Sequence, residues 1–207
     1  MKFIGFYNYT VVLTYLGAAA AVCGIFFCAE GNPYLGAICL LFAGLTDMFD
    51  GKIASTMERT PDQKAFGIQI DSLCDLISFG VLPVALGYGI GLRGFVFYLS
   101  AAVYLLAAVI RLAYFNVDEL SRQKTEDGVR RFYYGLPVTS AAALFPLVYG
   151  IGEYLGSALT AVYQALLYIC AVLFILKFRL PKPHGKALIP ILIFGLCIAA
   201  LVLFGGK

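Results

Sequence analysis

The chain of 207 residues is 61% hydrophobic and 13% charged, with a mean hydropathy of +0.88 and a formal net charge of +3. Soluble domains contain roughly half apolar and about a quarter charged residues, so this composition excludes a soluble domain and favours a bilayer protein. Apolar segments of the roughly 20 residues that a helix needs to span a membrane recur along the whole sequence. They predict a single membrane domain over residues 1–207.

Seven apolar segments are predicted, in chain order, to be membrane-spanning helices. No clear small-residue cleavage site follows the first, so we interpret it as a retained helix and not as a signal peptide. The expected fold class is all-α, a polytopic integral membrane bundle of about seven transmembrane helices. The predicted spans are residues 9–28, 34–53, 69–90, 94–115, 136–152, 158–177 and 187–204.

Basic residues predict the orientation of these spans in the cell membrane. If the N-terminus is inside, 13 of the 15 Lys and Arg residues fall on inner segments and two on outer ones, as the positive-inside rule requires. The predicted outer connections, at 29–33, 91–93 and 152–156, are too short to do more than turn the chain. Chemistry is therefore expected at the cytoplasmic face, where the basic segment 177–186 is predicted to lie against anionic headgroups.

Four aspartates in or beside the apolar segments require an explanation, because an ionised carboxylate near hydrocarbon costs several kcal/mol unless it is paired or metal-bound. Asp47 and Asp50 are three residues apart and Asp71 and Asp75 are four apart, so each pair projects from one helix face. The pairs lie at the inner end of the second span and the inner start of the third. These consecutive antiparallel helices would bring all four acids together.

The predicted ligand set contains only oxygen, which favours a hard divalent cation, Mg²⁺ or Mn²⁺ with Ca²⁺ also compatible, over zinc. The six cysteines lack CxxC spacing and His184 lies elsewhere, so neither a zinc site nor a disulfide framework is indicated. Gly51 and Gly67 beside the acids would let a bulky ligand approach the backbone. A phosphorylated substrate is the natural partner of such metals.

Two other interpretations of the acids stay open at this point. They could cap helices or pair with Lys52, Arg59 and Lys64 at the membrane interface. They could also mark an ion pathway, as in a divalent-cation transporter. The acids lie at one face with none deeper in other spans, which argues against a continuous pathway.

The spacing of these residues resembles that of the CDP-alcohol phosphotransferase family, whose signature is D-x-x-D-G-x-x-A-R, a spacer, and G-x-x-x-D-x-x-x-D. The run DSLCDLISFGVLP, with RLAYFN at 111–116 and FYYGLPV at 132–138, is similar to the phosphatidylserine synthase branch of that family. The resemblance covers roughly residues 40–140. The signature positions in this chain are Asp47, Asp50, Gly51, Ala54, Gly67, Asp71 and Asp75.

The chain departs from the family pattern at three points. Ser55 stands where the signature has arginine, Tyr114 stands where the R-L-A-R-F-N stretch has its second arginine, and the spacer before Gly67 is a few residues longer than usual. Lys52, Arg59 and Lys64 are the candidates to replace the missing charge at Ser55. The sequence does not choose among them.

The resemblance implies an enzyme that transfers a phosphatidyl group from CDP-diacylglycerol to the hydroxyl of L-serine and releases CMP. It implies two Mg²⁺ or Mn²⁺ ions held by Asp47, Asp50 and Asp71, with Asp75 as general base and further metal ligand. It also implies six core helices, here with one additional C-terminal span, and a homodimer among membrane lipids, without a nucleic-acid partner. Glycerol 3-phosphate and inositol phosphate are the alternative acceptors.

The remaining candidate residues would bind the substrates. An arginine fork suits a phosphate or the serine carboxylate, although snorkelling and lipid contact also explain arginines at span ends. Small hydroxyl residues likewise serve either ligand binding or helix packing. The nucleotide candidates are Gly51, Lys52, Ala54, Ser55 and Gly67, and the serine or phosphate candidates are Ser72, Ser78, Arg111, Arg130 and Arg131.

Overall fold

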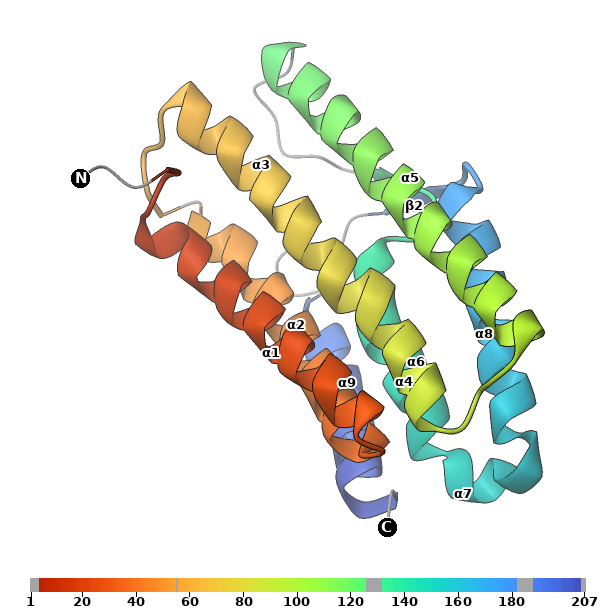
Figure 1. Cartoon of the computed structure of the whole chain (residues 1–207). Coiled ribbons are helices and arrows are strands. Elements are labelled where there is room, and N and C mark those ends of the chain that lie inside the picture. The colour runs from red at the N-terminus through yellow and green to blue at the C-terminus, as the bar shows by residue number, and fades with distance from the viewer. Residues whose placement is uncertain (1–3, 55, 126–131, 182–187, 206–207) are drawn as a thin grey trace.

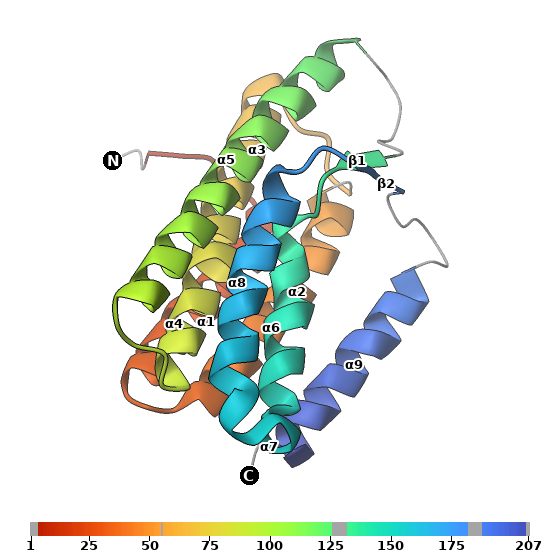
Figure 2. The same ribbon diagram turned by 90° about the vertical axis from the view of Figure 1, so that its right-hand side faces the viewer.

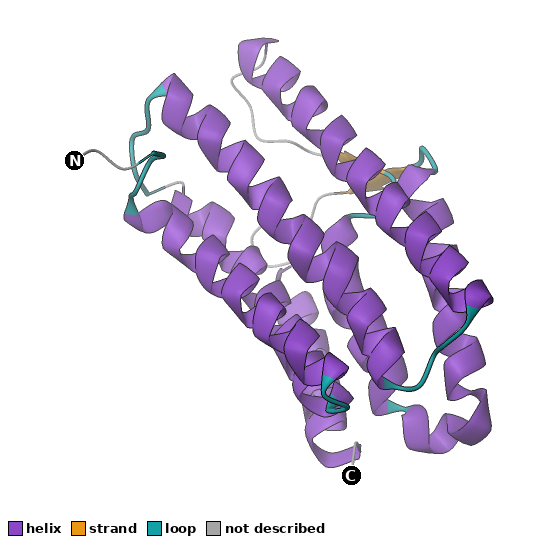
Figure 3. Ribbon diagram, viewed as in Figure 1, coloured by secondary structure: helices purple, strands orange, loops and turns teal. Residues whose placement is uncertain are grey.

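The computed structural model describes residues 4–54, 56–125, 132–181 and 188–205 as a bundle of helices with one small sheet (Figures 1 and 3). Its apolar centre contains buried residues from most of the long helices, among them Leu40, Leu82, Tyr104, Phe145 and Tyr163. The helices are α1 (Val12–Ala29), α2 (Pro33–Ala54), α3 (Pro61–Asp75), α4 (Leu82–Gly89), α5 (Phe95–Thr125), α6 (Ala141–Gly150), α7 (Gly152–Leu155), α8 (Leu159–Ile175) and α9 (Leu188–Gly205).

Four helical stretches in the described chain are long and apolar enough to span a membrane: Tyr9–Ala29, Pro61–Gly89, Phe95–Ser121 and Gly152–Ile175. Two shorter apolar helices cover Val138–Gly150 and Ile189–Phe204. These helices confirm the expected all-α membrane fold. The count of seven spans stays a prediction.

Three short connections join helices at the same end of the bundle (Figure 1). They link α1 to α2, α4 to α5, and α6 to α8 through α7, close to the three outer connections predicted from the sequence. Gly31 has φ +83° and Gly91 has φ +100°, a conformation that glycine adopts without steric cost. The first two connections therefore turn within a few residues.

The third helix begins earlier than its apolar segment predicted, at Pro61 instead of residue 69. Thr60 caps it by accepting a hydrogen bond from the Gln63 backbone N–H, and Gln63 bonds back to the Thr60 backbone. This capping box and the proline at the first turn start the helix in a polar segment. Hydropathy located only the apolar part of the helix.

A π-helix, η2 (Leu76–Val81), joins α3 to α4 and begins directly after Asp75. Such π segments are frequent at functional sites, and Pro83 has no N–H to donate to the carbonyl of Phe79, four residues before it. The buried Tyr104 hydroxyl donates to the Phe79 carbonyl at 2.6 Å, and the buried Tyr163 hydroxyl donates to the Pro83 carbonyl at 2.7 Å. Tyr104 of α5 thus stabilises the π-helix, and Tyr163 of α8 stabilises the first turn of α4.

One element lies outside the all-α expectation. Strand β1 (Phe132–Tyr134) pairs antiparallel with β2 (Arg179–Pro181), in the segment that the sequence predicted to be an irregular basic loop. The pairing joins the entry to α6 with the exit from α8, and the Leu136 N–H donates to the Leu173 carbonyl at 3.0 Å. Three-residue strands are too short to produce a period of two in the sequence, which is why hydropathy missed them.

Candidate metal centre

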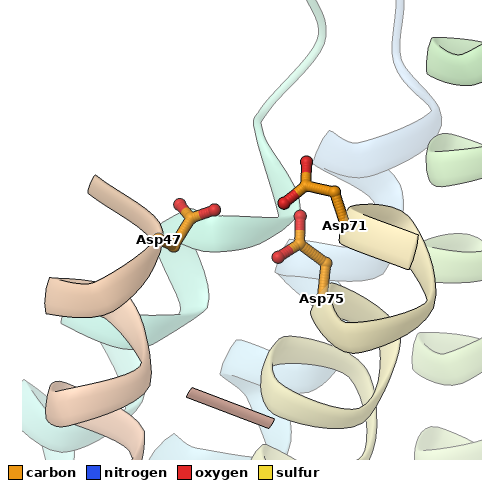
Figure 4. Close-up of side chains that lie close together, drawn as sticks. All are labelled: Asp47, Asp71 and Asp75. Carbon is orange, nitrogen blue, oxygen red and sulfur yellow. The ribbon is translucent and has the colours of Figure 1, made fainter. Parts of the chain in front are cut away.

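Three of the four predicted acids face one another across α2 and α3 (Figure 4). Asp47 projects from α2, and Asp71 and Asp75 project from successive turns of α3. One carboxylate oxygen from each residue lies within 4.8 Å of the others. Hard divalent cations bind carboxylate oxygens at about 2.0–2.6 Å, so this spacing fits ligands that share one ion.

Asp50 lies beside this triad and is held by α1. The Thr14 hydroxyl donates to Asp50 Oδ2 at 3.1 Å, and Asp50 lines the same cavity as Asp71. Carboxyl groups that gather in one site share a proton or bind a cation, because like charges disfavour ionisation of them all. Asp50 thus adds a fourth carboxyl group beside the triad, and carboxylate oxygens are the donor set that Mg²⁺ or Mn²⁺ prefers.

Close packing of α1 on α2 positions the acids of α2. Gly17 lies directly against Thr46, where any Cβ would collide with the threonine side chain. Small residues of this kind let membrane helices approach closely. Thr46 precedes Asp47, so the contact fixes the register of the acid pair relative to Thr14.

A cavity of about 1140 Å³ opens beside the acids. Asp47, Asp50, Asp71 and Asp75 line it together with Gly51, Lys52 and Arg111. A Cβ at Gly51 would meet nothing within 4 Å, so this glycine faces open space. Lys52, Arg111 and Gly51, which the sequence predicted to bind substrate, thus line the same cavity as the acids.

Arg111 is held in place on the α5 side of the cavity. It is only 6% exposed, its Nε donates to the Leu136 carbonyl at 3.3 Å, and its guanidinium lies 5.9 Å from the Phe115 ring centroid. A snorkelling arginine would extend to the membrane surface. This buried and oriented guanidinium is instead suited to bind an anionic group in the cavity.

Other predicted residues lie apart from the cavity. Ser72 donates to Asn116 Oδ1 at 2.6 Å, and Asn116 Nδ2 donates to Gln69 Oε1 at 3.3 Å, so Ser72 takes part in the packing of α3 on α5. Ser78 is buried beside Asp75 in a separate small cavity. Ala54 and Gly67 do not line the large cavity. Ser55, Arg130 and Arg131 lie outside the described residues.

The three candidates to replace the missing signature arginine occupy different places. Lys52 lines the cavity, and its ammonium lies 5.4 Å from the Phe49 ring centroid. Arg59 packs over Gly67, with Nη1 3.2 Å from the position that a Cβ would occupy. Lys64 is exposed. The structure therefore favours Lys52 as the cation that faces a ligand beside the acids.

Sequence reasoning missed several hydroxyl residues at the site, among them Thr14 and Thr139. Thr14 bonds Asp50 from another helix, and Thr139 lines the cavity from the turn η3 (Val138–Ser140). A threonine inside an apolar span was the available signal for Thr14, because polar residues in membrane helices usually find a partner. Thr139 follows directly after the FYYGLPV stretch.

Comparison with known proteins identifies the family to which this helical bundle with its four acids belongs. The sequence model described as CDP-alcohol phosphatidyltransferase matches residues 7–178. The chain belongs to the CDP-alcohol phosphatidyltransferase family. This confirms the resemblance found in the sequence and the expectation of a transferase.

Curated relatives in this family carry related names. The archaetidylserine synthase of Methanothermobacter thermautotrophicus is 30% identical over 84% of this chain and 70% of its own length. The CDP-diacylglycerol–serine O-phosphatidyltransferase of Saccharomyces cerevisiae is 33% identical over 47% of this chain and 35% of its own length. The enzyme of the same name from Helicobacter pylori is 33% identical over 58% of this chain and 48% of its own length. The chain thus spans less than half the length of the latter two relatives.

Proposed function

We propose that this CDP-alcohol phosphatidyltransferase transfers a phosphatidyl group from CDP-diacylglycerol to the hydroxyl of L-serine, giving phosphatidylserine and CMP. The observation that carries the proposal is the acid cluster of α2 and α3, which shares its cavity with Lys52 and Arg111. The names of the relatives support serine as the acceptor. Glycerol 3-phosphate and inositol phosphate remain acceptors to be tested.

The reaction requires one bond to form and one to break. The serine hydroxyl oxygen attacks the lipid-bearing phosphorus of the diphosphate, the bond from that phosphorus to the bridging oxygen breaks, and CMP leaves with that oxygen. Asp75 lies in the triad and faces the cavity, so it is the group we assign to orient the hydroxyl and accept its proton.

Asp47, Asp50 and Asp71 would hold Mg²⁺ or Mn²⁺. The bound ion would neutralise the negative charge of the diphosphate and the charge that develops on the departing CMP. Lys52 adds positive charge on the same side. Buried Arg111 would bind the serine carboxylate or a phosphate oxygen through its planar fork. Orientation by these fixed groups lowers the entropic part of the barrier.

We place this chemistry at the cytoplasmic face, with the N-terminus inside. Lys52 and Arg111 line the cavity beside the acids, and Arg179 lies in β2 with Lys177 just before it. Arg93 lies in the α4–α5 connection, and this connection and the sheet lie toward opposite ends of the bundle (Figure 2). The positive-inside rule then supports the assignment. The homodimer implied by the resemblance stays a prediction.

The test is CMP release by the purified chain from CDP-diacylglycerol, with and without L-serine, in Mn²⁺ or Mg²⁺ and again in EDTA. We expect release to require serine and metal, and Asp75→Asn to lower kcat by about 10²–10⁴-fold, because it removes the proton acceptor. Asp62→Asn, on the exposed first turn of α3, is the matched control and should retain activity.

Two outcomes would contradict the proposal in different ways. Release only with glycerol 3-phosphate or inositol phosphate would move the acceptor and keep the reaction. No release with any acceptor, together with movement of Mn²⁺ across sealed proteoliposomes, would replace the enzyme by a divalent-cation transporter.

A further inference from the structure

The C-terminal helix α9 forms a wall of the cavity that begins at the acids. The cavity extends between α2 and α9, where its lining is apolar and includes Ile38, Leu41 and Leu45 from α2 and Ile191, Gly195 and Ala199 from α9. Ile38 precedes Asp47 by nine residues of helix, which at 1.5 Å per residue places it about 14 Å from the acids. One end of the cavity is thus acidic and the other is hydrocarbon-like.

The packing of α9 leaves this space open on one side. Its C-terminal half packs on α6, where Ile198 and Val202 are buried and a Cβ at Gly150 would lie 3.0 Å from Leu201 Cγ. Its N-terminal half leans away from α6 (Figure 2), and Ile191 and Phe194 are about half exposed. The divergence leaves a groove between α2 and α9, which Ala142 and Ala143 of α6 also line.

Gly195 lies on the face of α9 that lines the groove, and a Cβ at this position would meet no atom within 4 Å. Glycine in a helix interior costs roughly 0.5–1 kcal/mol relative to alanine, and close helix packing does not explain it at this position. Ala199, one turn further on, also lines the cavity with a small side chain. The two residues keep the groove wide.

We propose that the groove between α2 and α9 binds one hydrocarbon chain of the donor lipid, and that Gly195 and Ala199 determine which chains fit. This inference rests on the proposed function, since it takes the diphosphate of a CDP-activated lipid to lie at the acids. A ligand that fills this cavity must carry a cation-binding anionic head and an apolar tail, and the donor lipid has both. Because the family match ends at residue 178, α9 supplies this wall from outside the matched region.

The test compares donors of two chain lengths with a groove-filling variant. We expect Gly195→Phe to raise the KM for dioleoyl CDP-diacylglycerol at least tenfold and the KM for the dihexanoyl donor less than twofold, because short chains do not pass the blocked segment. Ala200→Phe adds the same ring to an exposed residue of α9 that does not line the cavity, so it should change neither KM.

Equal KM values for wild type and Gly195→Phe with the dioleoyl donor, in correctly folded protein, would overturn the inference while leaving the proposed function intact. So would equal loss with both donors. Where Gly195→Phe fails to fold, Ala199→Phe takes its place.

A measurement without turnover separates this inference from the proposed reaction. A CDP-diacylglycerol analogue with a diazirine in its acyl chain should crosslink to α9 of the wild-type chain in Mn²⁺, and excess CDP-diacylglycerol should compete. Crosslinks confined to the lipid-exposed face of α5 would identify bulk-lipid contact only and contradict the groove. If the analogue labels α9, excess CDP-diacylglycerol competes with this labelling, and the protein releases no CMP, the groove proposal stands and the proposed transferase activity is rejected.

Discussion

Thr14 connects the first helix to the acids, because its hydroxyl donates a hydrogen bond to Asp50 Oδ2. Outer-shell groups that bond a metal ligand orient its oxygens and raise metal affinity. Thr14 does this from α1, whereas every predicted metal ligand lies on α2 or α3. The candidate metal centre therefore depends on three helices.

Replacement of this hydroxyl should weaken metal binding without removing a ligand. We expect Thr14→Val to raise the Kd for Mn²⁺ by about 10-fold, at the lower end of the effect of losing an outer-shell partner. Titration calorimetry in detergent measures it. Thr14→Ser keeps the hydroxyl and should bind Mn²⁺ like the wild type; a Thr14→Val Kd equal to that of Thr14→Ser would show that the bond does not support the site.

Among the elements, the irregular helix made of α3, η2 and α4 is the one that positions the site. Asp71 and Asp75 lie on its regular first part, and the π turn begins at the next residue, Leu76. Tyr104 of α5 bonds the Phe79 carbonyl inside the π segment. The departure from α geometry is thus balanced by a partner from another helix.

Removal of that partner tests its contribution to stability. We expect Tyr104→Phe to lower the free energy of unfolding by about 1–3 kcal/mol, because the Phe79 carbonyl stays buried without its donor. Reversible denaturation in mixed micelles measures this. Tyr98→Phe removes a hydroxyl from a residue that is 57% exposed and serves as control. An unchanged unfolding free energy for Tyr104→Phe would mean that the carbonyl finds another donor.

In the whole molecule, the acids of α2 and α3 would repel one another where the two helices meet. A bound cation would join the helices at this point. Asp47 and Asp50 belong to α2 and Asp71 and Asp75 to α3, so four carboxyl groups gather where the two helices approach. A divalent cation bound there converts this repulsion into attraction. Metal binding should therefore stabilise the bundle as well as serve catalysis.

Thermal unfolding tests this coupling. Mn²⁺ at 100 times its Kd should add about 2.7 kcal/mol to the free energy of unfolding, since a ligand that binds only the folded state stabilises it by mass action. The expected readout is a higher Tm in Mn²⁺ than in EDTA. Asp47→Asn should lose most of this rise, whereas Asp62→Asn should keep it. The same Tm in both buffers would exclude a tightly bound ion between α2 and α3.

The membrane class, the helical fold and the acid pairs could be predicted from the amino-acid sequence alone. These features are local: apolar length predicts a span, and spacings of three and four place Asp47 with Asp50 and Asp71 with Asp75 on single helix faces. The consecutive order of α2 and α3 then predicted that the pairs meet, and the structure brings Asp47, Asp71 and Asp75 together.

The residues that complete the site from distant parts of the chain could not be predicted and became apparent in the folded protein. Thr14 lies 36 residues before Asp50, Ser72 finds Asn116 44 residues away, and the wall at Gly195 faces residues of α2. Helical periodicity tells which side chains share a face, but it does not tell which face of another helix they meet. That choice is made by packing, through contacts such as Gly17 on Thr46 and the anchoring of α9 on Gly150.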